Sequence, residues 1–140
     1  MRICVIFSKG TSSDKDLKIV SAFIKGLEAA NNSVDFFDIS KEKEKLTSFY
    51  DYVAVGSSNI PLFGKKDDPL LEQFLKQNNI VAGRRSFAFT TKRVFGENKT
   101  LQSIMKIMEK EGMFITFSEV LKDEISAKEI GKNLVISKTE

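Results

Sequence analysis

The chain has 140 residues, with 22 Lys or Arg against 19 Asp or Glu, and therefore a formal net charge of +3. This length predicts a single domain over residues 1–140. The sequence has no His and one Cys, which excludes Ser-His-Asp triads, His- or Cys-based zinc sites and an intrachain disulfide. We expect no metal site. The sequence shows no signal-peptide pattern and no apolar run long enough for a membrane span, so we expect a cytoplasmic protein.

Five apolar segments predict β-strands. The first, Ile3–Phe7, is almost continuously apolar and ends at Ser8, as expected for a parallel strand covered on both faces. The same interpretation applies to Tyr52–Val55, Ser86–Phe89 and Met113–Phe117. A weaker segment, Val34–Ile39, is interrupted by two aspartates, which predicts an edge strand.

Apolar residues with helical spacing lie between the strands. The four stripes are Leu17, Val20, Phe23, Ile24 and Leu27; Leu70, Leu71, Phe74 and Leu75; Leu101, Ile104, Met105 and Met108; and Ala127, Ile130 and Leu134. The charged segment Lys41–Ser48 is too short and polar for a covering helix. It predicts one exposed turn, with Leu46 and Phe49 turned inward.

Capping residues mark the ends of these helices. Asp68 followed by Pro69 predicts an N-cap and a first helical position, and Gly112 predicts the end of the third helix. The pairs Ser13 with Asp16 and Ser126 with Glu129 predict capped starts for the first and last helices.

The resulting order, β-α-β-turn-β-α-β-α-β-α, specifies an α/β domain with a parallel sheet. The length favours a doubly wound, five-stranded sheet of order 2-1-3-4-5 over a barrel. Ligands of such sheets bind at the carboxyl ends of the strands, where the strand order reverses. Here that place lies between the first and third strands, and the loop after the fourth strand flanks it.

The loop after the first strand, Ser8–Ser13, is rich in hydroxyl groups and contains Lys9 and Gly10. Together with a helix N-terminus, these groups could bind a phosphate. The alternative is that the small polar residues only form a turn and a helix cap.

The loop after the third strand, Gly56–Gly64, contains three apolar residues that should lie at the surface: Ile60, Leu62 and Phe63. They could line a pocket for a flat ligand, contact a protein partner, or fold back on the domain as a small cluster.

The loop after the fourth strand, Thr90–Glu97, combines hydroxyl, basic and aromatic residues. Phe95 could stack on a ring, and Lys92 with Arg93 could meet an anion or an acidic partner. The alternative is a solvated basic loop.

Several segments resemble those of the flavodoxins and flavodoxin-like domains, over essentially the whole chain. They are Phe7–Ser13, similar to the phosphate loop of that family; Tyr50–Ser57, similar to its third strand; Phe89–Thr91; and Glu129–Leu134, similar to its closing helix. The resemblance implies a three-layer flavodoxin-like fold. It also implies noncovalent FMN and electron transfer, by a carrier or a small reductase.

The resemblance implies candidate site residues at the positions that match the motifs of the family. The candidate FMN-binding residues are Ser8, Lys9, Gly10, Thr11, Ser12, Ser13, Ser57, Ser58, Asn59, Phe63, Gly64, Thr90, Thr91, Phe95 and Gly96. The hydroxyl residues of the first loop would bind the phosphate, and the other two loops would cover the two sides of the isoalloxazine, with Phe63 as the stacking ring. No catalytic residue is implied, because the flavin carries the redox chemistry.

The sequence departs from the family pattern at Ser12, where glycine is usual, and at Asp14, where threonine is usual. An inward-facing Asp14 carboxylate would repel a phosphate. The net charge of +3 is opposite in sign to that of the usual carriers, which suggests either an acidic redox partner or a domain no longer used for electron exchange. The alternative function is a cofactor-free flavodoxin-fold module for interaction or regulation. Basic residues are interleaved with acidic ones, so we expect no nucleic-acid binding.

Overall fold

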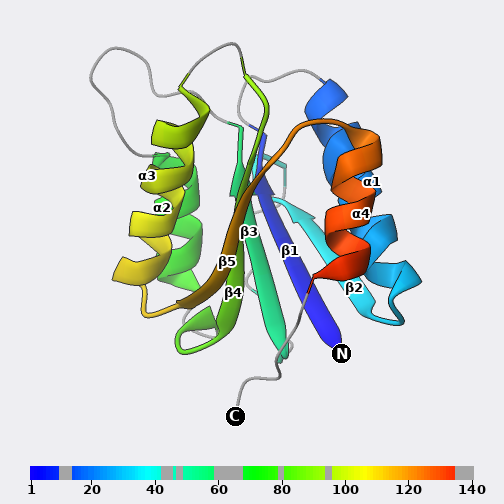
Figure 1. Cartoon of the computed structure of the whole chain (residues 1–140). Helices are drawn as coiled ribbons and strands as arrows, with labels where there is room; N and C mark the ends of the chain where they lie inside the picture. Colours follow the sequence, from blue (N-terminus) through cyan, green and yellow to red (C-terminus); the bar gives the residue numbers. More distant parts are fainter. Residues whose placement is uncertain are drawn as a thin grey trace.

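In the computed structural model of the chain, the described residues are 1–9, 14–41, 46, 49–58, 68–78, 81–93 and 96–134. Strands and helices alternate along them, except that β3 is the next described element after β2 (Figure 1). The elements are β1 (Arg2–Ser8), α1 (Asp14–Ala29), β2 (Ser33–Asp38), β3 (Tyr52–Ser57), α2 (Pro69–Gln77), β4 (Arg85–Thr91), α3 (Glu97–Lys110), β5 (Phe114–Leu121) and α4 (Glu124–Asn133). Within these ranges no helix is both long and apolar enough to span a membrane.

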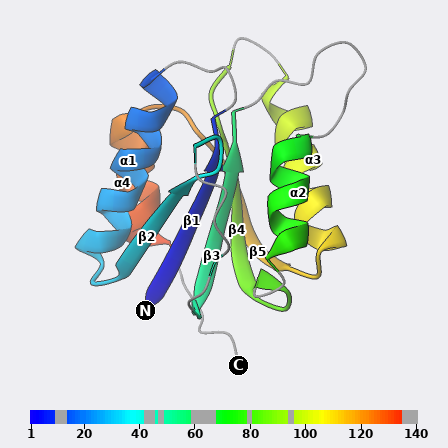
Figure 2. The ribbon, with the colours of Figure 1, turned by 180° about the vertical axis from the view of Figure 1, so that it is seen from behind.

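The five strands form one parallel sheet in the order β2-β1-β3-β4-β5. Helices α1 and α4 cover one face, and α2 and α3 cover the other (Figures 1 and 2). This arrangement confirms the predicted doubly wound α/β fold with its three layers. The carboxyl ends of the strands all lie at the same edge of the sheet, at the top of Figure 1.

The face under α1 and α4 has an aromatic core. Phe7 and Phe89 stack at 6.0 Å, and Phe23 of α1 lies 5.3 Å from Phe87. The two helices approach each other closely at glycines, because a Cβ on Gly26 or Gly131 would overlap main-chain atoms of the other helix. The two helices are therefore tightly packed against each other and against this face of the sheet.

The opposite face, under α2 and α3, has a mainly aliphatic core that includes Leu71, Leu75 and Ile104. A buried asparagine joins its parts: Asn78 accepts a hydrogen bond from the Leu46 N–H at 2.7 Å and donates to the carbonyl of Phe74 at 2.7 Å. This contact fixes Leu46 in the buried position that the sequence predicts.

The last strand departs from the prediction. The predicted order 2-1-3-4-5 correctly placed it at the sheet edge, but it was expected over Met113–Phe117 with both faces covered, and β5 runs to Leu121. Phe114 is 63% exposed and Phe117 is 52% exposed. The register with β4 shifts between Ser86 and Phe87. The predicted burial of both faces was wrong because apolar residues on an edge strand give the same sequence pattern as those on a central strand. The other edge, β2, was predicted correctly.

Smaller corrections concern one cap and one side chain. Helix α4 is capped by Asp123, which accepts a hydrogen bond from the Ser126 N–H at 2.7 Å, so Ser126 is not the N-cap. Phe49 is 56% exposed instead of buried, and its ring contacts the guanidinium of Arg84, which lies 3.7 Å from the ring centroid. The predicted cap at Ser13 lies outside the described residues.

Candidate functional site

The predicted site begins where β1 and β3 end side by side. Ser8, the last residue of β1, is paired in register with Ser57, the last residue of β3. The N–H of Ser58 donates to the Ser8 carbonyl at 3.0 Å and continues this pairing beyond the strands. The starts of the first and second loops therefore lie together, as the strand order requires.

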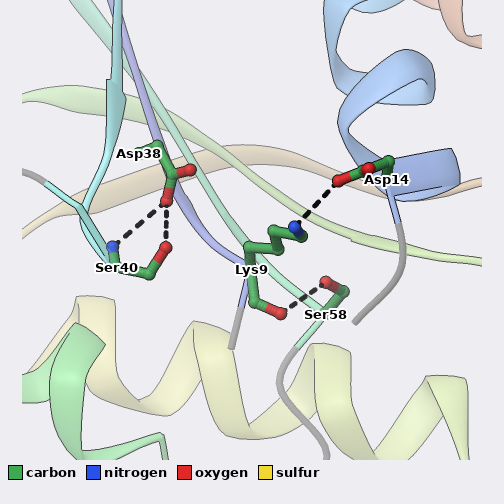
Figure 3. Close-up of polar contacts among 5 residues, drawn as sticks. All are labelled: Lys9, Asp14, Asp38, Ser40 and Ser58. Carbon is green, nitrogen blue, oxygen red and sulfur yellow. Dashed lines mark hydrogen bonds and ion pairs between the residues drawn. The ribbon is translucent and has the colours of Figure 1, made fainter. Parts of the chain in front are cut away.

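Lys9 joins three parts of this edge (Figure 3). Its carbonyl accepts a hydrogen bond from the Ser58 hydroxyl at 3.3 Å, and its ammonium donates to the Asp14 carboxylate at 3.0 Å. This bond, together with the charge of Lys9, lowers the pKa of Asp14. Asp14 is largely exposed, so the acidic residue that replaces the usual threonine is paired with the lysine of the preceding loop.

At the carboxyl end of β2, the polar residues form hydrogen bonds with one another. Asp38 is buried and accepts hydrogen bonds from both the N–H and the hydroxyl of Ser40 (Figure 3). Its register partner on β1 is Phe7. The carboxylate of Asp38 thus has its hydrogen bonds within a local turn.

Two of the predicted ligand hydroxyls form hydrogen bonds within the protein. Ser57 donates to the carboxylate of Asp68 at 2.8 Å, and Asp68 also caps α2 by accepting from the N–H groups of Leu70 and Leu71. Thr90 donates to the carbonyl of Ser57 at 2.7 Å. These bonds hold the ends of β3 and β4 and the start of α2 in place, which gives both hydroxyls a structural role.

Other polar groups at this edge are buried without a hydrogen-bond partner. They are the hydroxyls of Ser8 and Thr91 and the three guanidinium nitrogens of Arg93. Burial lowers the pKa of Arg93, and the nearby charge of Asp16 opposes this shift. Buried polar groups are nearly always hydrogen-bonded in folded proteins. Three of these unpaired groups lie at or just beyond the carboxyl ends of β1 and β4, and a fourth, the Ser86 hydroxyl, lies near the start of β4.

The two basic residues of the third loop differ in their surroundings. Lys92 is exposed, and its N–H donates to the Leu121 carbonyl at 3.0 Å. Arg93 has a buried guanidinium, and its N–H donates to the Glu97 carboxylate at 3.1 Å. From the sequence, both residues were predicted either to meet an anion or acidic partner or to lie in a solvated basic loop. In the structure, Lys92 is exposed and the guanidinium of Arg93 is buried.

Of the remaining predicted site residues, only Gly96 lies within the described ranges. Gly96 is exposed, has a φ of 84° and begins α3, where its carbonyl accepts from Thr100. The residues that lie outside the described ranges are Gly10, Thr11, Ser12, Ser13, Asn59, Phe63, Gly64 and Phe95. Asp68 was predicted as a cap, but its bond to Ser57 has no signal in the sequence because the two lie on different elements.

Comparison with solved structures supports the fold. A flavodoxin from the domain Archaea superposes with a TM-score of 0.71 at 22% identity, over 96% of each chain. Oxidised flavodoxin 1 from Bacillus cereus gives 0.66 at 11% identity, over 96% of this chain and 100% of that chain. An NADH:FMN oxidoreductase in its apo form gives 0.66 at 13%, over 97% and 90%. No family model and no curated protein sequence matches. At these identities the structures show a flavodoxin-like fold.

Proposed function

We propose that the chain binds FMN noncovalently at the carboxyl edge of the sheet and takes part in electron transfer. The observation that carries this proposal is the pair of buried, unpartnered hydroxyls of Ser8 and Thr91, at the ends of two strands that flank β3. A phosphorylated, hydroxyl-rich ligand would satisfy such groups. The similarity to flavodoxins and to an NADH:FMN oxidoreductase supports FMN as that ligand.

The residues of this edge fit the two ends of FMN. Ser8 and the N-terminal turn of α1 would hold the phosphate, since helix N-termini bind anions. The Lys9–Asp14 bond keeps the carboxylate of Asp14 paired, which reduces its repulsion of a phosphate. Gly96 and the loop that follows β3 would contact the ring system. When bound, FMN supplies the redox chemistry, and the chain supplies binding and orientation.

The partner would be an acidic redox protein in the cytoplasm. A groove between α1 and α4 is lined by three lysines, Lys18, Lys25 and Lys128, together with Glu124 and Ile125. Ile125 is 81% exposed. The excess of positive charge in this groove favours an acidic surface, and an exposed apolar residue among lysines suits a protein contact.

A second candidate function is a cofactor-free interaction module. The observation that favours it is the internal use of the Ser57 and Thr90 hydroxyls, which bond to Asp68 and to the Ser57 carbonyl. In such a module these bonds would rigidify an edge that no longer binds a ligand.

An absorption spectrum of the purified protein, with and without added FMN, separates the two functions. We expect flavin absorbance, and quenching of FMN fluorescence on titration. Thr91→Val should weaken FMN binding about threefold to tenfold, because one hydrogen bond is lost. Ser21→Ala, on the exposed side of α1, is the control and should bind FMN like the native chain. A colourless protein that leaves FMN fluorescence unchanged would favour the cofactor-free module.

A further inference from the structure

The guanidinium of Arg93 is the most unusual charged group in the described part of the chain. Its Nε, Nη1 and Nη2 atoms are all buried, and none has a hydrogen-bond partner. An arginine side chain stays charged at any physiological pH and carries five N–H donors. It therefore cannot avoid the energetic cost of burying a charge by losing a proton, as a lysine can. A buried charge of this kind needs an anion.

The strand alternation places this group on one face of the sheet. Phe87 and Phe89 pack in the aromatic core under α1 and α4, and side chains two residues apart on a strand share a face. Thr91 lies on that face, and continuing the alternation brings Arg93 toward α1. The electrostatic effect of Asp16, in the first turn of α1, agrees with this placement.

The backbone holds this segment in position from both sides. The N–H of Lys92 donates to the Leu121 carbonyl at 3.0 Å, and the N–H of Arg93 donates to the Glu97 carboxylate at 3.1 Å. The segment is thus tied to β5 through Lys92 and to α3 through Arg93. Its side chain is left to face the first turn of α1.

The acidic groups near this turn do not neutralise Arg93. Asp14 is bonded to Lys9 at 3.0 Å, and Glu97 accepts the main-chain N–H of Arg93. Asp16 acts on the guanidinium through its charge, but none of the guanidinium nitrogens has a hydrogen bond to it. Among the described residues, no carboxylate is hydrogen-bonded to this guanidinium, which leaves room for an external anion.

We infer that Arg93, together with the Thr91 hydroxyl and the first turn of α1, binds the oxyanion of a phosphate monoester. The planar guanidinium matches two phosphate oxygens at once. The helix N-terminus adds N–H donors and a favourable dipole, and Thr91 adds a buried, unpartnered hydroxyl. The identification of the ester as FMN rests on the proposed function. Arg93 adds an ionic contact to the hydroxyl-lined phosphate loop that the sequence predicts.

The first experiment uses inorganic phosphate as the probe. Thermal unfolding is followed with increasing phosphate, against chloride at equal ionic strength. We expect phosphate to raise the melting temperature of the native chain. Arg93→Met should have a higher melting temperature than the native chain without phosphate, because an unpaired buried charge is removed, and should bind phosphate at least about tenfold more weakly. Lys92→Met, which removes the exposed neighbouring charge, should respond to phosphate like the native chain.

Two outcomes of this experiment would overturn the inference. One is an Arg93→Met variant that responds to phosphate as the native chain does. The other is a native chain that does not respond to phosphate while Arg93→Met is destabilised, which would assign Arg93 a structural role with Asp16.

A second experiment separates this inference from the proposed function by comparing FMN with riboflavin, which lacks the phosphate. If the native chain prefers FMN and Arg93→Met loses most of that preference, both proposals stand. If the chain binds FMN and Arg93→Met keeps the full preference, FMN binding stands and the role of Arg93 is wrong. If neither flavin binds but phosphate binding depends on Arg93, the anion site stands and FMN is the wrong ligand.

Discussion

The two helical layers hold the same sheet by different means. On one face, α1 and α4 meet at Gly26 and Gly131 so closely that main-chain atoms leave no room for a Cβ. On the other face, α2 is fixed by polar contacts, through the cap at Asp68 and the hydrogen bonds of Asn78. The first layer is packed at backbone contact distance, and the second adds buried hydrogen bonds to its aliphatic core.

The same difference appears at the carboxyl edge of the sheet. The hydroxyls of Ser57 and Thr90 are bonded within the protein, and Ser57 reaches α2 through Asp68. Thr91 and Arg93, toward α1, keep buried groups with no partner. The comparison teaches that neighbouring hydroxyls at this edge differ: Ser57 and Thr90 are paired within the protein, whereas Ser8 and Thr91, on opposite faces of the sheet, are not.

The largest effect is expected from adding a methyl group at the position where α1 and α4 touch. Gly131→Ala would place a methyl group against the carbonyl of Phe23, so the helices would have to separate. We expect a loss of about 3 kcal/mol in the free energy of unfolding, at the upper end for overpacking. In an open helix the same change would stabilise. Urea unfolding measures the loss, and Lys132→Ala, at the exposed neighbouring position, should change stability by less than about 0.5 kcal/mol. Equal stability of Gly131→Ala and the native chain would mean that the helices do not pack this closely.

An intermediate effect is expected from the polar layer. Asp68→Ala removes the cap of α2 and leaves the buried Ser57 hydroxyl without its carboxylate partner. We expect a loss of about 2–3 kcal/mol. The matched control is Asp123→Ala, an exposed aspartate that caps α4, which should cost about 1 kcal/mol. Equal losses in the two variants, measured by urea unfolding, would show that the Ser57–Asp68 bond adds nothing beyond the cap.

The smallest effect is expected at the exposed Lys9–Asp14 pair. The hydrogen bond from Lys9 lowers the pKa of Asp14 in the folded chain. Its stabilising contribution is therefore present above the usual aspartate pKa, and it is lost as the pH falls through the lowered value. Carboxyl chemical shifts in an NMR pH titration should give this lowered pKa, and Lys9→Met should raise it toward the usual range. A pKa of Asp14 that is the same in both proteins would contradict the pairing.

The sequence by itself determined the order of the elements and the class of fold. Apolar runs at Ile3–Phe7 and Tyr52–Val55 and the cap at Asp68–Pro69 are local signals, and the structure confirms them. Local signals suffice because strand and helix periodicity depends on neighbours along the chain. The same signals located the carboxyl edge, since strand order fixes where the ends of β1 and β3 meet.

The tertiary structure decided which groups at that edge are paired. Ser57, Thr90 and Thr91 are alike in sequence as hydroxyl residues, yet only the first two have partners inside the protein. Lys92 and Arg93 are adjacent and both basic, yet only Arg93 has a buried charge. Pairing and burial depend on what packs against a side chain from distant parts of the chain. For this reason the exposure of Phe114 and Phe117 on β5 and the unpartnered arginine became visible only once the helices were placed on the sheet.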